Sequence, residues 1–358
     1  MSRDICVFYL QDDITLFHTL FPLLTSVKYK KQCFFTSNLD YVINRSKERI
    51  LILFRYFKRR DIIADESIYE KFRDRFDRVI YFDDNSSADG LNVFALPYVD
   101  VYFKKQIYKD LSLYTRDFYG KRYFSDYYHQ KNGIIDDPEK IRPAISEQLL
   151  SKIHLSWNLG IGCYPKSRLR KAIVRRTYPL LGLNGLSLIY NKPEKYRVKK
   201  SFPINKISAR YGTSFDINSV KFHRDIYQKK VMDSDLFLTG KVPLKQYNDE
   251  LKNVFATFSP FGWGEVCFRD FEAIINKSVL IKPSMDHIET WPNVYVNDET
   301  YLPVDWDGTN LLEKAEMLLD SSNMQEALAE NAYDVYITAF SKLNKKLDDF
   351  FEIVYEGI

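Results

Sequence analysis

Glycine, arginine and glutamate lie close together in the segment Phe258–Ala273, which reads FSPFGWGEVCFRDFEA. Gly262 and Gly264 fall in a predicted loop between a strand and a helix, where glycines let the backbone approach a ligand closely. The N-terminus of the helix that follows would offer free N–H groups and a partial positive charge to a phosphate. The segment therefore has the residue types of a phosphate-binding loop.

Charged side chains on the same predicted helix extend this chemistry. Arg269 can hold a diphosphate through paired hydrogen bonds. Glu272, one turn into the helix, carries a carboxylate that can accept both hydroxyls of a ribose. An ordinary glycine-containing loop with an acidic residue near a helix start would look the same, because short glycine motifs are common. The residues alone leave both interpretations open.

Carboxylates also follow a predicted strand in the first half of the chain. Asp83 and Asp84 come directly after Val79–Phe82, at the end of a strand, where open α/β sheets gather their ligand contacts. Either could serve as a general base. A turn stabilised by aspartate side chains is the alternative for this pair, and the same two interpretations apply to Asp12 and Asp13.

Strands and helices alternate along both halves of the sequence, which indicates βαβ units and mostly parallel sheets. Strands are predicted at Ile5–Leu10, Gln32–Thr36, Ile50–Phe57, Val79–Phe82 and Val99–Lys104, and again at Ile204–Arg210, Leu236–Gly240, Val254–Ser259 and Val279–Pro283. Helices are predicted at Ile14–Thr25, Ser219–Lys230, Leu244–Asn253, Arg269–Asn276 and throughout Leu311–Tyr355. Ile145–Pro165 has the pattern of a helix followed by a loop. Two doubly wound domains are the simplest account.

Length and composition agree with this organisation. A chain of 358 residues is long enough for two domains, and 45% hydrophobic with 28% charged residues excludes a largely disordered protein. No window approaches the roughly 18 apolar residues that span a bilayer, and the charged start MSRDICVFYLQDD is not expected to be a signal peptide. Isolated cysteines argue against a zinc site or a disulfide framework and favour a reducing, cytoplasmic location. They are Cys6, Cys33, Cys163 and Cys267.

Positive charge is concentrated in one segment. Lys166–Lys200 contains eleven Lys and Arg residues and one acid, Glu194, so its net charge is +10. Because the whole chain has a net charge of +4, the remaining residues together carry −6. A chain that is mildly acidic elsewhere is not built like a general nucleic-acid binder, and no nucleic-acid partner is expected. The segment could contact a membrane surface with anionic headgroups. A charged linker between domains is the alternative.

The order of elements from Leu236 resembles the nucleotide-sugar-binding domain of GT-B glycosyltransferases, in particular family 4 and the exostosin-like enzymes. The resemblance is carried by Thr239–Pro243 (TGKVP) before a helix, by the glycine loop with Glu272 and Ala273, and by the strand Val279–Pro283. It covers most of residues 200–340. In residues 1–165 it is limited to the alternation of strands and helices.

The resemblance implies a GT-B architecture, with two Rossmann-like, doubly wound α/β domains that face an interdomain cleft. Its parts would be an acceptor-binding domain at 1–165, a basic connecting segment at 166–200, a nucleotide-sugar-binding domain at 201–335 and a C-terminal helix at 336–358 that returns to the first domain. Asn158 and Gly160 would line the cleft where the domains meet, and a glycine-rich linker is the alternative for this segment.

Glu272 maps onto the ribose-binding glutamate of the family. Arg210, at a strand end, and Lys282 would neutralise the leaving diphosphate. The resemblance implies the full donor-binding set Arg210, Gly262, Gly264, Glu265, Arg269, Glu272 and Lys282, with Asp83 and Asp84 as the catalytic candidates. The sequence departs from the family 4 pattern at Ser259, which stands where that family has the first of two glutamates.

The expected function is transfer of a sugar from a nucleotide-sugar to a cell-surface polysaccharide, such as lipopolysaccharide or capsule, or to a glycolipid. No cofactor or metal is expected: Asp305-Trp306-Asp307 spells a metal motif of another glycosyltransferase fold, but Asp307 or Thr309 should cap a helix starting near Asn310. The enzyme would be cytoplasmic, with a peripheral contact at the inner face of the membrane through Lys166–Lys200. Another GT-B enzyme, an epimerase or phosphorylase, and a non-catalytic membrane- or polymer-binding protein are the alternatives. The donor sugar and base, the acceptor, the stereochemistry and the oligomeric state stay open.

Overall fold

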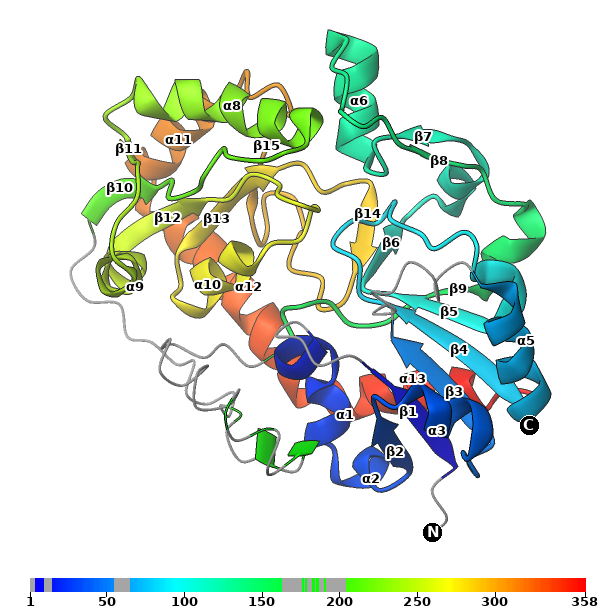
Figure 1. The fold of residues 1–358 in the computed structure, drawn as a ribbon. Coiled ribbons are helices and arrows are strands. Elements are labelled where there is room, and N and C mark those ends of the chain that lie inside the picture. The colour runs from blue at the N-terminus through cyan, green and yellow to red at the C-terminus, as the bar shows by residue number, and fades with distance from the viewer. Residues whose placement is uncertain are drawn as a thin grey trace.

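A computed structural model describes residues 4–9, 15–54, 65–162 and 204–358, together with residues 176, 178, 182, 183, 185, 186 and 190. These residues form two domains, each built around a parallel sheet (Figure 1). Asp12 and Asp13 lie outside the described residues, as does most of the basic segment Lys166–Lys200. Within the described part of the chain, no helix is both long and apolar enough to cross a bilayer.

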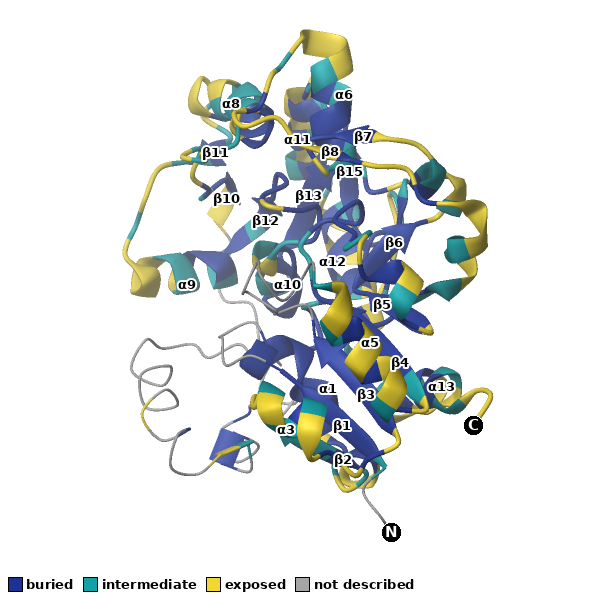
Figure 2. Ribbon diagram, turned by 45° about the vertical axis from the view of Figure 1, so that its right-hand side comes forward, coloured by how far each residue is buried: buried dark blue, intermediate teal, exposed yellow. Residues whose placement is uncertain are grey.

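The first domain contains a six-stranded sheet in the order β2-β1-β3-β4-β5-β9, in which every neighbouring pair is parallel. Its strands are β1 (Ile5–Phe8), β2 (Cys33–Thr36), β3 (Ile50–Phe54), β4 (Arg78–Asp83), β5 (Val101–Lys104) and β9 (Ile153–Leu155). Its helices include a π-helix (Thr15–Thr19), α1 (Phe21–Thr25), α2 (Val27–Lys30), α3 (Leu39–Asn44), α5 (Glu66–Arg75) and α6 (Tyr123–Asn132). Strands such as β3, with the sequence ILILF, are buried along their whole length because helices cover the sheet (Figure 2).

The second domain contains a five-stranded parallel sheet in the order β11-β10-β12-β13-β15. Its strands are β10 (Ile204–Ser208), β11 (Phe237–Leu238), β12 (Val254–Phe258), β13 (Val279–Pro283) and β15 (Leu302–Val304). The helices are α8 (Asn218–Met232), α9 (Leu244–Asn253), α10 (Phe268–Ile275), α11 (Leu311–Asp320) and α12 (Ser322–Ser341). From β10 the chain moves first to one side of the sheet and then to the other, so a topological switch point lies between β10 and β12.

Short elements join the two domains. Strand β6 (Gln106–Tyr108) of the first domain pairs antiparallel with β14 (Ile288–Thr290) of the second. After α12, helix α13 (Leu343–Tyr355) packs against the first domain, where Phe350 contacts Phe103 with ring centres 4.3 Å apart. A small antiparallel pair, β7 (Phe118–Tyr119) with β8 (Ile141–Arg142), completes the set of sheets in the described residues.

The predicted fold class is confirmed: two Rossmann-like, doubly wound α/β domains face one another in a GT-B arrangement. One local prediction needs correction. Ile145–Pro165 contains a short 3₁₀ helix at Glu147–Lys152 and then β9, instead of one helix and a loop. Leu311–Tyr355, predicted to be helical throughout, contains three helices, α11, α12 and α13. After β5, where the sequence predicts no further element before residue 145, the structure has β6, β7 and α6.

Candidate functional site

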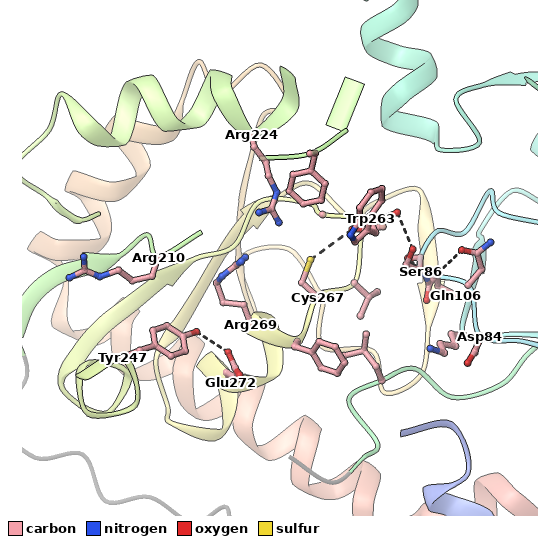
Figure 3. A pocket seen from close by; sticks show the side chains of 18 residues that line it. Asp84, Ser86, Gln106, Arg210, Arg224, Tyr247, Trp263, Cys267, Arg269 and Glu272 are labelled. Carbon is pink, nitrogen blue, oxygen red and sulfur yellow. Dashed lines mark hydrogen bonds between the residues drawn. The ribbon is translucent and has the colours of Figure 1, made fainter. Parts of the chain in front are cut away.

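A cavity of about 600 Å³ lies between the domains, at the carboxyl ends of strands from both sheets (Figure 3). On the second-domain side it lies at the switch point between β10 and β12, where ligands bind in open α/β sheets. The first domain contributes the segments that follow β4 and β5. The lining residues are Asp84, Asn85, Ser86, Lys105, Gln106, Leu159, Arg210, Phe215, Arg224, Tyr247, Gly262, Trp263, Gly264, Val266, Cys267, Phe268, Arg269 and Glu272.

The glycine loop after β12 forms one wall of the pocket and also touches the first domain. The amide of Gly262 donates to the carbonyl of Gly264 at 3.0 Å, which closes a tight turn. A Cβ atom on Gly264 would lie 1.6 Å from the carbonyl oxygen of Ser86, so only glycine fits there. The Ser86 hydroxyl donates to the carbonyl of Trp263 at 3.0 Å. The same loop therefore forms a wall of the pocket and contacts the first domain.

Helix α10 begins at the pocket, since Cys267, Phe268 and Arg269 all line it. The N-terminus of a helix carries a partial positive charge. Here the Cys267 amide donates to the Asp270 carboxylate at 2.9 Å, which caps this end of the helix. Glu272, on the next turn, is half-buried and accepts a hydrogen bond from the Tyr247 hydroxyl at 2.8 Å. Burial, followed by the charge of Glu272, raises the pKa of Tyr247, so this hydroxyl stays a donor. A carboxylate is thus held in a fixed orientation at the pocket wall.

Of the arginines at the pocket, Arg269 donates to the Ser259 hydroxyl at 3.2 Å. Arg210 forms an ion pair with Glu250, with Nη2 2.7 Å from Oε2. Figure 3 shows the Arg210 guanidinium turned away from Arg269 and Glu272. Arg210 therefore lines the pocket with its stem while its charge is matched elsewhere.

Lys282 lies outside the pocket, and its predicted contact with a diphosphate needs correction. Its side chain is fully buried and its ammonium lies 3.1 Å from Oδ2 of Asp270, which is also fully buried. The ammonium also donates to the carbonyl of Ser259 at 3.2 Å. The charge of Lys282 is therefore neutralised within the second domain.

Glu265 likewise lies outside the pocket lining, although it was predicted among the donor-binding residues. Its side chain is fully buried and accepts from the Ser87 hydroxyl and the Ala88 amide, each at 3.1 Å. Burial raises the pKa of this carboxyl, and the nearby charge of Arg122 opposes that rise. Glu265 connects the glycine loop to the first domain.

The two candidate catalytic carboxylates separate in the structure. Asp83 is buried in an ion pair with Lys104 at 3.1 Å and accepts from the Tyr102 hydroxyl at 2.7 Å, so its predicted catalytic role needs correction. Asp84 lines the pocket and accepts from the Thr19 hydroxyl at 3.2 Å. Of the pair, Asp84 alone is on the wall.

Asn158 and Gly160 lie at the junction of the domains but not on the pocket wall, where Leu159 stands instead. The Asn158 amide group donates to the Thr290 hydroxyl at 2.8 Å, and its oxygen accepts from the Gly160 amide. A Cβ on Gly160 would collide with the Phe271 ring. These residues pack the junction, which corrects their predicted cleft-lining role.

Asp305 and Asp307 form a turn before α11. Asp307 accepts from the amide and hydroxyl of Thr309, and the N-cap of α11 is Asn310, which corrects the predicted cap. Among the residues that the structure describes, no group of three or more His, Cys, Asp or Glu side chains could hold a metal ion.

Several pocket residues escaped the sequence analysis. Arg224 on α8 is not among the predicted site residues, yet it is 6% exposed and lines the pocket. Tyr247, on α9, was not singled out because a lone tyrosine on a predicted helix carries no motif. The remaining unpredicted members of the wall that carry polar or aromatic side chains are Asn85, Ser86, Lys105, Gln106, Phe215, Trp263, Cys267 and Phe268.

No model of a known protein family matches the chain, and no curated protein matches it in sequence. Solved structures resemble it at low identity. A glycosyltransferase from Rickettsia africae is 10% identical, with 99% of each chain covered and a TM-score of 0.47. Anabaena HepE in complex with UDP-glucose is 7% identical, covering 98% of this chain and 99% of HepE, with a TM-score of 0.45.

An alpha-glucosyltransferase in complex with UDP-glucose and DNA is 11% identical, covering 99% of this chain and 100% of that one, with a TM-score of 0.44. This complex contradicts the expectation that excluded nucleic acid as a partner, an expectation drawn from charge balance alone. We therefore withdraw that exclusion. Identities near 10% and TM-scores below 0.5 leave the function to be argued from the pocket itself.

Proposed function

We propose that this chain is a glycosyltransferase that transfers a sugar from a nucleotide-sugar donor to an acceptor held by the first domain. The observation that carries the proposal is one interdomain pocket in which Glu272, Arg269 and the N-terminus of α10 stand together opposite Asp84. To bind a nucleotide-sugar, a pocket needs a hydrogen-bond acceptor for the ribose hydroxyls and positive charge for the diphosphate. To transfer the sugar, it also needs a surface that binds the molecule receiving it. The pocket offers all three.

The donor would lie along the second-domain wall. Glu272, oriented by Tyr247, accepts hydrogen bonds from the ribose hydroxyls. The diphosphate faces Arg269 and the first turn of α10, which stabilise the negative charge that develops as the sugar leaves. Because these groups are fixed before the reaction, little reorganisation accompanies the transfer.

The acceptor would approach from the first-domain wall, where Asp84, Lys105 and Gln106 lie. Within the proposal, Asp84 binds the attacking hydroxyl and takes its proton. The acceptor class we propose is a cell-surface polysaccharide or a glycolipid. The charge of +10 on Lys166–Lys200 supports it, because a basic segment is attracted to an anionic membrane surface that presents lipid-linked glycans.

We propose that the reaction needs no metal ion, because arginine side chains and a helix N-terminus already supply positive charge to the diphosphate. We expect turnover to persist after treatment with EDTA. Turnover measured with and without added Mg²⁺ or Mn²⁺ tests this expectation, and loss of activity on chelation that either ion restores would contradict it.

Thermal-shift measurements with UDP, GDP, CMP, TDP and ADP test the proposal. A nucleotide at a hundred times its dissociation constant stabilises the native state by about 2.7 kcal/mol, which gives a measurable rise in melting temperature. We expect a rise with one nucleotide and its loss in Glu272→Ala. Glu313→Ala, on an exposed position of α11, is the matched control and should keep the rise. No rise with any nucleotide would contradict the proposal.

A second measurement separates transfer from other chemistry in the same pocket. The nucleotide-sugar that corresponds to the stabilising nucleotide is incubated with lipid-linked and soluble glycans, and the products are analysed by mass spectrometry. Addition of one sugar to an acceptor, with release of the nucleotide, supports glycosyl transfer. Isomerised donor without transfer would indicate an epimerase, and no turnover would indicate a binding protein.

A further inference from the structure

Arg224 is held rigidly at the pocket although it comes from the middle of α8. Its Nε donates to the carbonyl of Phe261 and its Nη1 to the carbonyl of Gly212, both at 2.6 Å. The guanidinium carbon lies 4.7 Å from the centre of the Phe215 ring. Two carbonyls and an aromatic face therefore fix a buried cation. Its Nη2 lies beside Gly262 and has no hydrogen-bond partner among the described residues.

Arg269 faces Arg224 from α10. Figure 3 shows the two side chains extending toward one another across the pocket wall. Both guanidinium groups lie near the Tyr211 ring, with centroid distances of 5.7 Å for Arg224 and 5.9 Å for Arg269. Burial, followed by the charge of Arg269, lowers the pKa of Arg224 to about 10. Two like charges in a partly desolvated pocket repel one another unless an anion lies between them.

Other basic residues nearby differ in having a carboxylate partner. Arg210 is paired with Glu250, and Lys282 with Asp270, and the carboxylate side chains of both pairs are buried. Within the described residues, neither Arg224 nor Arg269 forms an ion pair with a carboxylate. Of the three arginines that line the pocket, Arg224 and Arg269 are therefore the two without a carboxylate partner among the described residues.

We propose that Arg224 and Arg269 together form the subsite for the diphosphate of the donor, and that Arg210 and Lys282 serve the fold instead. The proposal rests on the proposed function for the source of the diphosphate. Two planar guanidinium groups can each give paired hydrogen bonds to phosphate oxygens, and the first turn of α10 adds backbone amides at the same place. An anion between the arginines would also remove their mutual repulsion.

Calorimetric titration with two probes tests the subsite. The first probe is whichever of UDP, GDP, TDP and ADP stabilises the native chain most, and the second is inorganic pyrophosphate. The variants are Arg269→Gln and Arg224→Gln, with Arg210→Gln as the contrasting arginine and Lys245→Gln, exposed on α9, as a neutral control. The nucleoside without phosphates is titrated alongside, because its affinity should not depend on the subsite.

We expect Arg269→Gln and Arg224→Gln each to weaken nucleoside diphosphate and pyrophosphate binding at least tenfold, with the nucleoside unchanged. Arg210→Gln should lower the melting temperature of the free protein, because Glu250 loses its partner, while its diphosphate affinity stays within threefold. Replacing Arg224 also removes hydrogen bonds to two carbonyls. Should that variant fail to fold, Arg269→Gln and Arg269→Lys decide, with Lys restoring part of the affinity.

The outcomes for the subsite and for the proposed function differ. Unchanged diphosphate affinity in Arg269→Gln, or a larger loss in Arg210→Gln, overturns the subsite while nucleotide binding by the native chain still supports the function. Pyrophosphate binding that is lost in Arg269→Gln, with no nucleoside diphosphate bound by the native chain, supports an anion subsite and contradicts the function. If the native chain binds neither a nucleoside diphosphate nor pyrophosphate, the subsite and the proposed function are both overturned.

Discussion

Two adjacent carboxylates, Asp83 and Asp84, are both buried but have different partners. The Asp83 side chain is 1% exposed and shares its oxygen Oδ2 between the Lys104 ammonium and the Tyr102 hydroxyl. Breaking a buried ion pair by removing one charge leaves the other uncompensated, which typically costs about 3–5 kcal/mol. Asp84 instead lies at the pocket, beside Thr19 from the π-helix. The pair therefore offers a matched test in which each residue is the control for the other.

We expect Asp84→Asn to lower turnover by about a hundredfold or more, the usual scale for loss of a general base, with donor affinity and melting temperature nearly unchanged. Asp83→Asn should lower the melting temperature by many degrees because the charge of Lys104 becomes unpaired. Steady-state kinetics and thermal melts of both variants check this. Normal turnover in Asp84→Asn would remove Asp84 from the chemistry.

Glu265 makes stability depend on pH. Burial raises its pKa in the folded chain above the ordinary value of 4.5, so the folded state holds its proton to higher pH than the unfolded state. Its contribution to stability is therefore largest at low pH and falls as pH rises from 4.5 through the raised pKa. Glutamine keeps an acceptor for the Ala88 amide and does not ionise.

Glu265→Gln should therefore gain stability relative to the native chain as pH rises through that window. Above the window, the difference in free energy of unfolding between the two proteins should be constant. Chemical denaturation of both proteins between pH 4 and pH 9 gives the difference, in which the other carboxylates cancel. A gap that does not change with pH would contradict the expected titration of this side chain.

The sequence could predict site residues whose role depends on local position. Glu272, Arg269, Gly262 and Gly264 follow from a strand, a glycine loop and a helix start, and all four line the pocket. It could not show that Lys282 meets Asp270, because that contact depends on how α10 packs on β13. The same applies to Glu265 and Asp83, whose partners lie across an interdomain contact and on a neighbouring strand. Arg224 was not predicted because helical spacing does not reveal which face of α8 is covered.

At the scale of elements, the glycine loop after β12 has to fit two surfaces at once. Its Gly264 lies against the backbone of Ser86, while Gly262, Trp263, Gly264 and Val266 line the pocket. Gly264→Ala would place a methyl group inside the volume of the Ser86 carbonyl, and inserting even one methylene into a tight contact costs about 1–3 kcal/mol. The loop would shift rather than the sheet, since β12 is held by β10 and β13.

We therefore expect Gly264→Ala to weaken nucleotide binding and to lower the melting temperature. Gly240→Ala is not a suitable control, because Gly240 has a positive φ that alanine rarely adopts. Gly212→Ala, where a Cβ meets nothing within 4 Å and φ is not positive, serves instead and should change both quantities little. Isothermal titration and thermal melts measure the two effects. Equal behaviour of the two variants would mean that the close approach to Ser86 is not required.

Element prediction succeeded where apolar strands and polar helices alternate, as at β13 and α9, whose predicted bounds match the structure. It missed β6 and β14, three residues each, because their pairing joins positions far apart in the chain and no periodicity develops over three residues. It missed β9 for the same reason: its pairing with β5 spans about fifty residues. Short strands are defined by their partners, not by their own pattern.

For the whole molecule, helix α13 decides whether the two domains behave as one unit. It continues from α12, which packs on the second domain, and it places Phe350 against Phe82, Phe103 and Trp157 of the first. The ion pair of Lys28 with Asp348 and a hydrogen bond from Arg78 to the carbonyl of Ile353 lie along the same interface. Because the surface ion pair contributes little, the aromatic core carries the connection.

Phe350→Ala should lower the free energy of unfolding by about 3–5 kcal/mol, as for other buried Phe-to-Ala changes. Since β6 with β14 and the contacts of Glu265 also bridge the domains, we expect both to unfold in one transition at a lower temperature. Calorimetry measures this, with Leu312→Ala on the partly exposed face of α11 as the control. A stabilising nucleotide should then raise that single transition, although it contacts mainly the second domain. Two separate transitions, with the nucleotide shifting only one, would show that the pocket belongs to one domain alone and that α13 does not couple them.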